Sequence, residues 1–398
     1  MSLGFADALL VFGALLAVAA ALSGLMHGTV LSISVLGLTV GIALAAAGVV
    51  HVDPGSIGLV ELIELALVLT LFSDGLSAER ELLRFHWQPV VRAIVIAMPV
   101  TMALLGLFAH TLIGGLTWAE AFLLAAVLSP TDPVITSTIV TSRRVPALVR
   151  HTLNLESGLN DGLAVPFVLF FLVLARPGPN PGPEALTLLG EAAFGAFVGI
   201  VLGAAAGRLH RRLPGGGITR RYEGIYAIGF GLAAFGLAEV TIGNGFVAAF
   251  VCGLVMGAAE HDIPDAFSEF AENVSAISQV ITFFVFGALI YSVGYGGEIW
   301  RLAIFIVFVL LVARPVAISV AFVRARLPRA QQAFISWFGP KGAASMLFAL
   351  FVLDSHVAGK ATIFAVAAFT VIASIVAHGL TDTLGAHWIE RRMEQSGS

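Results

Sequence analysis

Ser129-Pro130-Thr131-Asp132-Pro133 and Glu156-Ser157-Gly158-Leu159-Asn160-Asp161-Gly162 are the stretches of this chain that decide its fold. Both place carboxylates inside runs that are otherwise apolar enough to cross a lipid bilayer. An ionisable side chain at membrane depth is costly, so it marks an ion site or a proton relay that other polar groups surround. The two stretches together predict one cation site.

The first stretch predicts a broken helix. Pro130 and Pro133 remove backbone donors and push Thr131 and Asp132 away from helical geometry. An irregular backbone at membrane depth is tolerated only where it lines a cavity or is buried in protein. We therefore expect two half-helices joined by an extended segment at Thr131 and Asp132.

The second stretch predicts an uninterrupted helix with two polar stripes. Ser157 and Asp161 are four residues apart, as are Glu156 and Asn160, so each pair lies on one side of the helix. Carboxylate and hydroxyl oxygens are the ligands that a hard cation prefers. A hydrogen-bond network that only holds two helices together is the alternative explanation for the same residues.

The composition is that of a membrane protein. Of the 398 residues, 58% are apolar and 12% are charged, and the mean hydropathy is +0.97, which lies outside the range of soluble globular proteins. The lone cysteine, Cys252, excludes an internal disulfide and a cysteine-based metal cluster. We therefore predict an all-α polytopic membrane protein without a cofactor, in which residues 1–398 form a single transmembrane unit.

At about 20 apolar residues per crossing, the chain divides into thirteen predicted transmembrane helices. Residues 1–25 lack a basic N-terminal region, so we interpret them as the first helix and not as a cleaved signal. Residues 176–184, rich in proline and glycine, are predicted to be a linker between two halves. The predicted spans lie near residues 5–25, 29–50, 56–74, 89–113, 118–141, 151–175, 186–207, 222–240, 243–259, 270–293, 299–323, 331–353 and 359–380.

The basic residues predict the orientation. If the C-terminus is cytoplasmic, sixteen arginines fall in inside loops, and only Arg176, Arg301 and Lys360 fall in outside loops. Because cytoplasmic loops carry the excess of basic residues, we expect a multi-pass protein of the cell (inner) membrane. Its N-terminus would lie outside and its C-terminus in the cytoplasm.

A second broken helix is predicted at Trp337-Phe338-Gly339-Pro340-Lys341-Gly342, within the twelfth span. The fifth and twelfth spans are seven apart, so they cross the membrane in opposite directions, which is typical of an inverted repeat with its site at the midplane. Such breaks bring positive helix N-termini and negative C-termini together. Asp132 would offset the former and Lys341 the latter. Arg314, in the eleventh span, lies at the depth of Glu156 and is expected to pair with it.

These motifs resemble those of the monovalent cation/proton antiporters, and most of all the sodium/proton exchanger branch with an Asn-Asp motif. The resemblance rests on Thr-Asp-Pro-Val at 131–134, Glu-Ser-Gly-Leu-Asn-Asp-Gly at 156–162, Arg314, and Gly-Pro-Lys-Gly at 339–342. It implies a thirteen-helix homodimer that works by an elevator-like movement. Residues 89–175 and 299–380 would form the halves of a mobile ion-binding core. Residues 1–74 and 186–293 would supply mostly dimerisation and scaffold helices, with part of the core.

The resemblance also implies roles for the site residues. Asp161 would carry the ion, and Glu156, Ser157 and the backbone near Thr131 would complete the shell. Arg314 would hold Glu156, so that this pair tunes the site more than it carries the ion.

Three residues keep open assignments. Asp132 either coordinates the cation or only compensates a helix dipole, and Asn160 either joins the site or only orients its neighbours. Lys341 departs from the branch, in which many exchangers have arginine, and a lysine can itself titrate.

The expected activity is one-for-one, electroneutral exchange of sodium or lithium for protons by alternating access. A carboxylate removed from water can hold a proton or a cation, but not both, and Asn160 stands where a second aspartate would add another carrier. A potassium/proton antiporter is the closest alternative, because site dimensions cannot be read from the sequence. A channel would present rings or filters of repeated ligands, and an intramembrane enzyme would need a base near Ser157. The sequence offers neither, so we expect a transporter and not an enzyme.

The third predicted span and the stretch that follows it contain further acidic residues. Glu61 and Glu64 are three residues apart and either flank a funnel or form hydrogen bonds within an interface. The stretch from Asp74 to Arg84 is interpreted as a helix end that meets the cytoplasmic surface.

Overall fold

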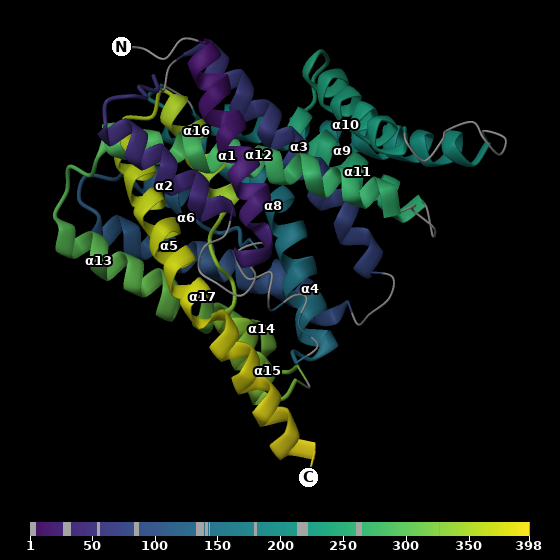
Figure 1. Cartoon of the computed structure of the whole chain (residues 1–398), viewed down its shortest axis with the longest axis vertical. Coiled ribbons are helices and arrows are strands. Elements are labelled where there is room, and N and C mark those ends of the chain that lie inside the picture. The colour runs from purple at the N-terminus through teal and green to yellow at the C-terminus, as the bar shows by residue number, and fades with distance from the viewer. Residues whose placement is uncertain are drawn as a thin grey trace.

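The structure is a computed structural model that describes residues 5–26, 33–53, 56–82, 87–132, 139, 142, 144–178, 181–212, 222–259, 265–325 and 327–397. The described part of the chain is helical throughout, without a β-strand (Figure 1). Its helices are α1 Phe5–Met26, α2 Ile33–Ala46, α3 Ile57–Leu82, α4 Gln88–Arg92, α5 Met98–Leu112, α6 Trp118–Val127, α8 Ala147–Ala175, α9 Pro181–Arg212, α10 Glu223–Glu239, α11 Gly245–Ala259, α12 Asp265–Val293, α13 Ile299–Phe308, α14 Arg314–Phe322, α15 Arg329–Trp337, α16 Ala343–Asp354 and α17 Lys360–Gly397, together with the π-helical segments η1 Ala93–Ala97 and η3 Val309–Ala313.

Six helical stretches among these residues are long and apolar enough to cross a membrane, by length and composition. They are Gln88–Leu112, Ala147–Ala175, Gly182–Arg212, Ala276–Val293, Ile299–Phe322 and Lys360–Gln395. Shorter apolar helices accompany them, and two of these, α6 and α16, are the halves of spans that the sequence predicts to be broken. An all-helical, polytopic membrane architecture is therefore confirmed. The linker predicted at residues 176–184 is too long, because α9 already begins at Pro181. Proline fits the first position of a helix, where its missing N–H would have no helical partner.

Glycines let several helices approach each other closely. On α3, a Cβ added to Gly75 would lie 2.3 Å from the carbonyl oxygen of Phe250 on α11. In return, a Cβ added to Gly253 on α11 would lie 2.3 Å from the carbonyl oxygen of Phe72. Small residues at such crossings let backbones touch, which is how helices gain packing energy in lipid. α11 is thereby held against α3 on one side and packs against α9 on another.

Two π-helical segments occupy matching places in the sequence. η1 precedes Met98-Pro99 and η3 precedes Arg314-Pro315. Proline has no N–H, so the carbonyl four residues earlier, of Val95 or Leu311, loses its usual helical donor, and the helix widens there. η1 lies in the fourth predicted span and η3 in the eleventh, which are again seven spans apart. η3 directly precedes Arg314 in the chain, and η1 lines a very small cavity together with Arg314, so both π-segments lie beside this residue.

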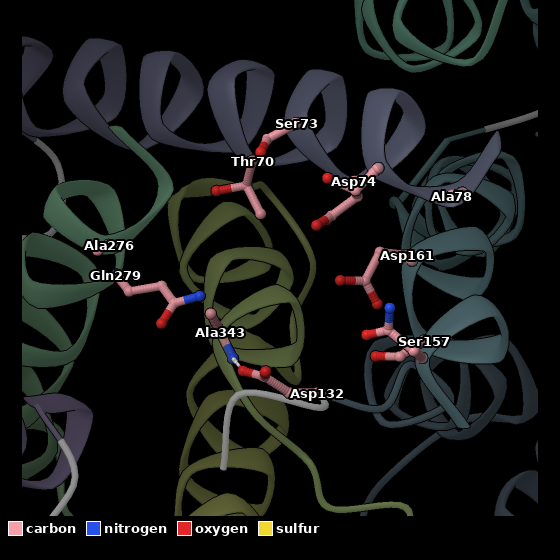
Figure 2. A pocket seen from close by; sticks show the side chains of 13 residues that line it. Thr70, Ser73, Asp74, Ala78, Asp132, Ser157, Asp161, Ala276, Gln279 and Ala343 are labelled. Atoms are coloured by element: carbon pink, nitrogen blue, oxygen red, sulfur yellow. Dashed lines mark hydrogen bonds between the residues drawn. The ribbon is translucent and has the colours of Figure 1, made fainter. Parts of the chain in front are cut away.

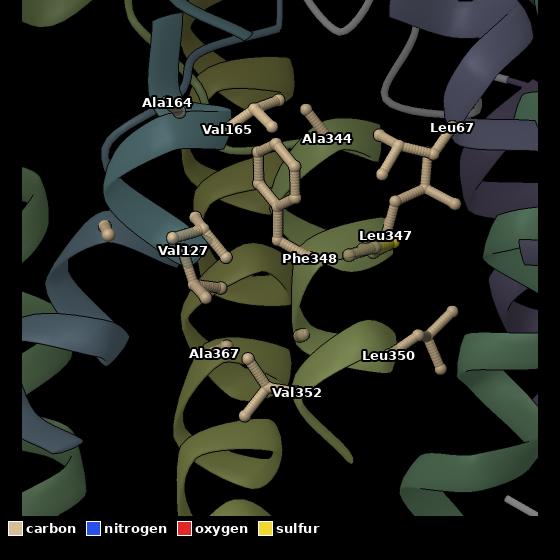
Figure 3. Close-up of a cluster of buried hydrophobic side chains, with 14 of the residues drawn as sticks. Leu67, Val127, Ala164, Val165, Ala344, Leu347, Phe348, Leu350, Val352 and Ala367 are labelled. Carbon is tan, nitrogen blue, oxygen red and sulfur yellow. The ribbon is translucent and has the colours of Figure 1, made fainter. Parts of the chain in front are cut away.

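The half-helix α16 lies at the centre of the largest hydrophobic core. Every residue from Ala343 to Leu350 is buried, and all but Ser345 are apolar, so this helix is surrounded by protein on all sides. Figure 3 shows Phe348 and Leu347 of α16 among side chains from α3, α6, α8 and α17. The N-terminus of α16 therefore opens into the protein interior, where its free N–H groups need partners.

Candidate cation-binding site

The two broken helices meet through their interruptions. α6 ends at Val127, and residues 128–132 are not helical; residues 133–138 of the predicted break lie outside the described part of the chain. α15 ends at Trp337 and α16 begins at Ala343, with residues 338–342 not helical between them. The N–H of Asp132 donates to the carbonyl oxygen of Pro340 at 2.8 Å, so each interruption holds the other in place.

Two charged side chains neutralise the helix ends that the interruptions leave open. Asp132 accepts a hydrogen bond at Oδ2 from the N–H of Ala343, the first residue of α16, at 3.0 Å. The Nζ of Lys341 donates to the carbonyl oxygens of Ser129 and Pro130, just beyond α6, at 3.2 and 3.1 Å. A carboxylate thus faces the positive N-terminus of one half-helix, and an ammonium faces the negative C-terminus of the other.

Two side chains of α8 form hydrogen bonds with the first interruption, at Thr131. Asn160 donates from Nδ2 to the Thr131 hydroxyl at 2.8 Å, and its Oδ1 accepts from the Thr131 N–H at 3.4 Å. The Ser157 hydroxyl makes a short hydrogen bond to the Thr131 carbonyl oxygen. The conformation of Thr131 is therefore fixed by α8.

Glu156 and Arg314 form a buried, bidentate ion pair. Arg314 donates from its two terminal nitrogens to the two carboxylate oxygens of Glu156, at 2.7 and 2.9 Å. The guanidinium also donates to the carbonyl oxygens of Ile335 and Phe338 at 3.2 and 3.5 Å. Gly339 makes room for it, because a Cβ there would lie 2.1 Å from Arg314 Nε. Arg314 therefore neutralises both Glu156 and the C-terminal end of α15.

The two polar stripes of α8 face different places. Ser157 and Asp161 line a cavity of about 380 Å³ together with Asp132. Glu156 and Asn160 instead line a very small cavity beside Arg314 and Lys341. The structure thus brings Ser157, Asp161 and Asp132 to one cavity and places Glu156 and Asn160 behind it.

Asp74 is a residue of this cavity that the sequence interpretation missed. α3 ends at Leu82, within the stretch from Asp74 to Arg84 that was interpreted as a helix end. The placement of Asp74 at the surface is wrong, however, since its side chain lines the cavity. Figure 2 shows the carboxyl groups of Asp74 and Asp161 near each other, projecting from α3 and α8 into the same cavity. The two carboxyl groups lie within hydrogen-bonding reach of each other, but the buried atoms Asp161 Oδ1 and Asp74 Oδ2 have no donor among the described residues. Buried carboxylate oxygens without donors require a proton or a cation for stability.

The polar residues of α3 that line the cavity have a spacing that is visible in the sequence. Thr70, Ser73, Asp74 and Ser77 follow the spacing of one helix face, and all four line the cavity. α12 also lines the cavity, and its Gln279 side chain extends toward Ala343 (Figure 2). The cavity therefore offers oxygen atoms from carboxyl, hydroxyl and amide groups, which suits a hard cation.

The acidic residues outside this cavity have different surroundings. Glu64 is half-buried and Glu61 is exposed, and neither lines the cavity. Glu120 caps α6 by accepting from the Thr117 N–H at 2.8 Å and also accepts from the Gly359 N–H at 2.6 Å. Glu120 therefore has a structural role at the start of α6.

Comparisons with known proteins show what this chain is similar to. Residues 11–384 match the family model described as sodium/hydrogen exchanger, transmembrane. The chain is 28% identical over 329 residues to the K(+)/H(+) antiporter NhaP of Alkalimonas amylolytica, covering 82% of this chain and 57% of that protein. It is 25% identical over 367 residues to the Na(+)/H(+) antiporter 2 of Zygosaccharomyces rouxii, covering 80% and 44%. The chain thus spans about half the length of the curated relatives it matches.

A solved structure has a similar fold. The sodium proton antiporter MjNhaP1 from Methanocaldococcus jannaschii superimposes with a TM-score of 0.74 at 18% identity, covering 95% of this chain and 97% of that one. At this identity the likeness concerns the fold.

Proposed function

Because the chain belongs to the sodium/hydrogen exchanger family, we propose that it exchanges a monovalent cation for protons across the membrane, with Asp161 as the shared carrier. The observation that carries this proposal is the position of the Asp161 carboxyl group. It lies in a polar cavity beside the two broken helices, opposite Asp74, and one of its buried oxygens has no donor among the described residues.

Competition at one carboxyl group gives the mechanism. A proton or a cation neutralises Asp161, but the two exclude each other at the same oxygens. If only the neutralised forms can cross, an inward movement of one ion requires an outward movement of the other. Asn160 makes hydrogen bonds to Thr131 and adds no charge, which supports a one-for-one, electroneutral exchange.

The cation shell follows from the same geometry. Asp161 and Ser157 would bind the cation directly. The Thr131 carbonyl oxygen, which accepts a hydrogen bond from the Ser157 hydroxyl, would lie next to the bound cation. Asp132 is held by the N-terminus of α16, so its first role is to compensate the helix dipole while it adds negative charge to the cavity. Glu156, paired with Arg314, would act through the position of α8 and not as a carrier.

The larger architecture is part of the proposal. Thirteen transmembrane helices would form two inverted units, with residues 89–175 and 299–380 as the mobile core and residues 1–74 and 186–293 mostly as a dimerisation scaffold. The cavity supports this division, because α8 and α16 form one wall of it and α3 and α12 form the other. A homodimer would move its cores against the scaffold in an elevator-like manner, with the C-terminus in the cytoplasm of the inner membrane.

Sodium or lithium is the cation we propose, with potassium as the alternative. The names of the relatives include both sodium and potassium antiporters, and similarity of about 25–28% does not separate them. A dye-dequenching assay in proteoliposomes, with each alkali cation added in turn across a range of pH, discriminates the candidates.

The decisive variant is Asp161→Asn, which keeps the size of the side chain and removes its charge. We expect it to lose cation-driven proton flux, whereas the matched control Asp354→Asn, an exposed residue at the other end of α16, should keep it. Normal flux from Asp161→Asn would overturn the assignment.

Saturable counterflow distinguishes an antiporter from a channel, and rates that follow an imposed membrane potential would contradict electroneutral exchange.

A further inference from the structure

One face of α17 carries a row of small and polar residues that meets the second broken helix. Ser374, His378, Thr381 and Gly385 are spaced by four, three and four residues, so they share one side of the helix. Each of them contacts the segment from Trp337 to Lys341.

Three polar side chains of this row reach the segment by hydrogen bonds. The Thr381 hydroxyl accepts from the Trp337 indole Nε1 at 2.9 Å, and the Ser374 hydroxyl accepts from the Lys341 N–H at 2.8 Å. His378 Nε2 lies 2.9 Å from the Trp337 carbonyl oxygen. His378 Nδ1 lies 2.7 Å from the Ser374 carbonyl oxygen, and carbonyls only accept, so a neutral ring donates to one of the two carbonyls. The tautomer with its proton on Nε2 makes the hydrogen bond to Trp337.

The fourth position of the row provides space. A Cβ added to Gly385 would lie 2.4 Å from the ring of Phe338, so the glycine lets this ring pack against α17. Ser374 and His378 are 0% and 2% exposed, which places the contacts away from water. Hydrogen bonds in such surroundings are costly to break, because the partner groups cannot turn to solvent.

α17 supplies partners to backbone groups at the two ends of the break. The carbonyl of Trp337, the last residue of α15, accepts from the Gly339 N–H at 3.0 Å and also faces His378. Lys341 precedes α16, so its N–H has no helical acceptor, and it donates to Ser374. We propose that Ser374, His378 and Thr381 are positioning residues that fix the segment 337–341 and, through it, the cation site. This inference rests on the proposed function.

Hydrogen bonds connect the segment contacted by α17 to the residues around the cation cavity. Within the segment, the Pro340 carbonyl accepts from the N–H of Asp132 at 2.8 Å. The side chain of Lys341 bonds to the carbonyls of Ser129 and Pro130, which directly precede Thr131. A shift of the segment therefore moves Asp132, which lines the cation cavity, and Thr131, whose carbonyl oxygen is hydrogen-bonded to Ser157.

Two threonines of α17 provide a matched test. Thr370 and Thr381 both donate to the carbonyl four residues earlier, at 2.7 and 2.8 Å, but only Thr381 also accepts from Trp337. Valine preserves the shape of threonine and removes the hydroxyl. We expect Thr381→Val to raise the apparent KM for the transported cation about tenfold, the effect of losing one buried hydrogen bond. Thr370→Val should leave the KM within about twofold of wild type.

His378 gives a rescue experiment. His378→Leu removes the donor and should raise the apparent KM about tenfold, while His378→Gln places an amide N–H near the Nε2 position and should restore most of the affinity. Sodium and potassium are titrated separately at fixed pH, and the maximal rate is measured with each. Equal KM values in Thr381→Val, Thr370→Val and wild type would overturn the inference, as would a His378→Gln variant no better than His378→Leu.

Hydrogen–deuterium exchange separates failure of this inference from failure of the proposed function. The backbone amides of residues 338–342 should exchange faster in Thr381→Val and His378→Leu than in Thr370→Val, whether or not transport is observed. If wild type shows no cation-driven proton flux, the proposed function fails. If wild type transports and exchange at residues 338–342 is unchanged in the variants, the positioning role fails.

Discussion

Replacing Gly342 by alanine tests whether the cation site depends on Asp132 at the N-terminus of α16. A Cβ at position 342 would lie 2.1 Å from Asp132 Oδ2 and 2.3 Å from its Cβ, whereas ordinary contacts begin at 3.4 Å. The carboxylate therefore has to move by about 1 Å or more. Its 3.0 Å hydrogen bond from the N–H of Ala343 does not survive such a shift.

The expected loss follows from that hydrogen bond. A hydrogen bond to a charged group contributes about 1.5–3 kcal/mol, and each 1.4 kcal/mol corresponds to about a factor of ten. We therefore expect Gly342→Ala to lower the transport rate at sub-saturating cation by roughly ten- to hundredfold. The assay is dye dequenching in proteoliposomes with equal amounts of reconstituted protein. Gly236→Ala on α10 is the matched control, because an added Cβ there meets nothing within 4 Å.

A double variant isolates the cause. Asp132→Gly removes the three side-chain atoms that the new methyl group would meet, so Asp132→Gly/Gly342→Ala should transport no worse than Asp132→Gly alone. Non-additivity of this kind is expected when two changes act on one contact. Wild-type rates from Gly342→Ala, or losses that simply add in the double variant, would refute the reasoning.

Three further changes follow from the same structure. Arg314→Gln leaves Glu156 buried without its partner and should lower the free energy of unfolding by about 3–5 kcal/mol; a melting curve in detergent like that of wild type would contradict this. Asp74→Asn removes one negative charge from the cavity and should raise the apparent KM for the cation about tenfold while exchange persists; an unchanged KM in the proteoliposome assay counts against a role for Asp74. Lys341→Met leaves the Ser129 and Pro130 carbonyls without their charged donor and should cost about 1–3 kcal/mol of stability, which chemical denaturation measures against wild type.

The helical membrane architecture was predictable because its causes are local. Apolar runs long enough to cross a bilayer fold into helices, since lipid offers no other partner for backbone N–H and C=O groups. The breaks near Thr131 and Pro340 were predictable for a similar reason, because proline removes a donor wherever it stands. The pairing of Arg314 with Glu156 was expected from their depth, and the structure has this ion pair.

The arrangement of side chains around the cavity could be predicted from the sequence only in part. The spacing of Thr70, Ser73, Asp74 and Ser77 on α3 was visible in the sequence, as was that of Ser374, His378 and Thr381 on α17. Such spacing says which residues share a helix face, but not which neighbour that face meets. Asp74 was therefore assigned to the surface, although α3 turns it toward Asp161.

The sequence by itself determined that this protein is a bundle of membrane helices, interrupted twice, with charged groups at the interruptions. Only the tertiary structure decided that Ser157 and Asp161 face the cavity while Glu156 and Asn160 face away from it. The physical reason is that the rotation of a helix about its own axis is fixed by packing between distant segments. Here that packing includes the close α3–α11 crossing at Gly75 and Gly253 and the hydrogen bonds from α8 to Thr131.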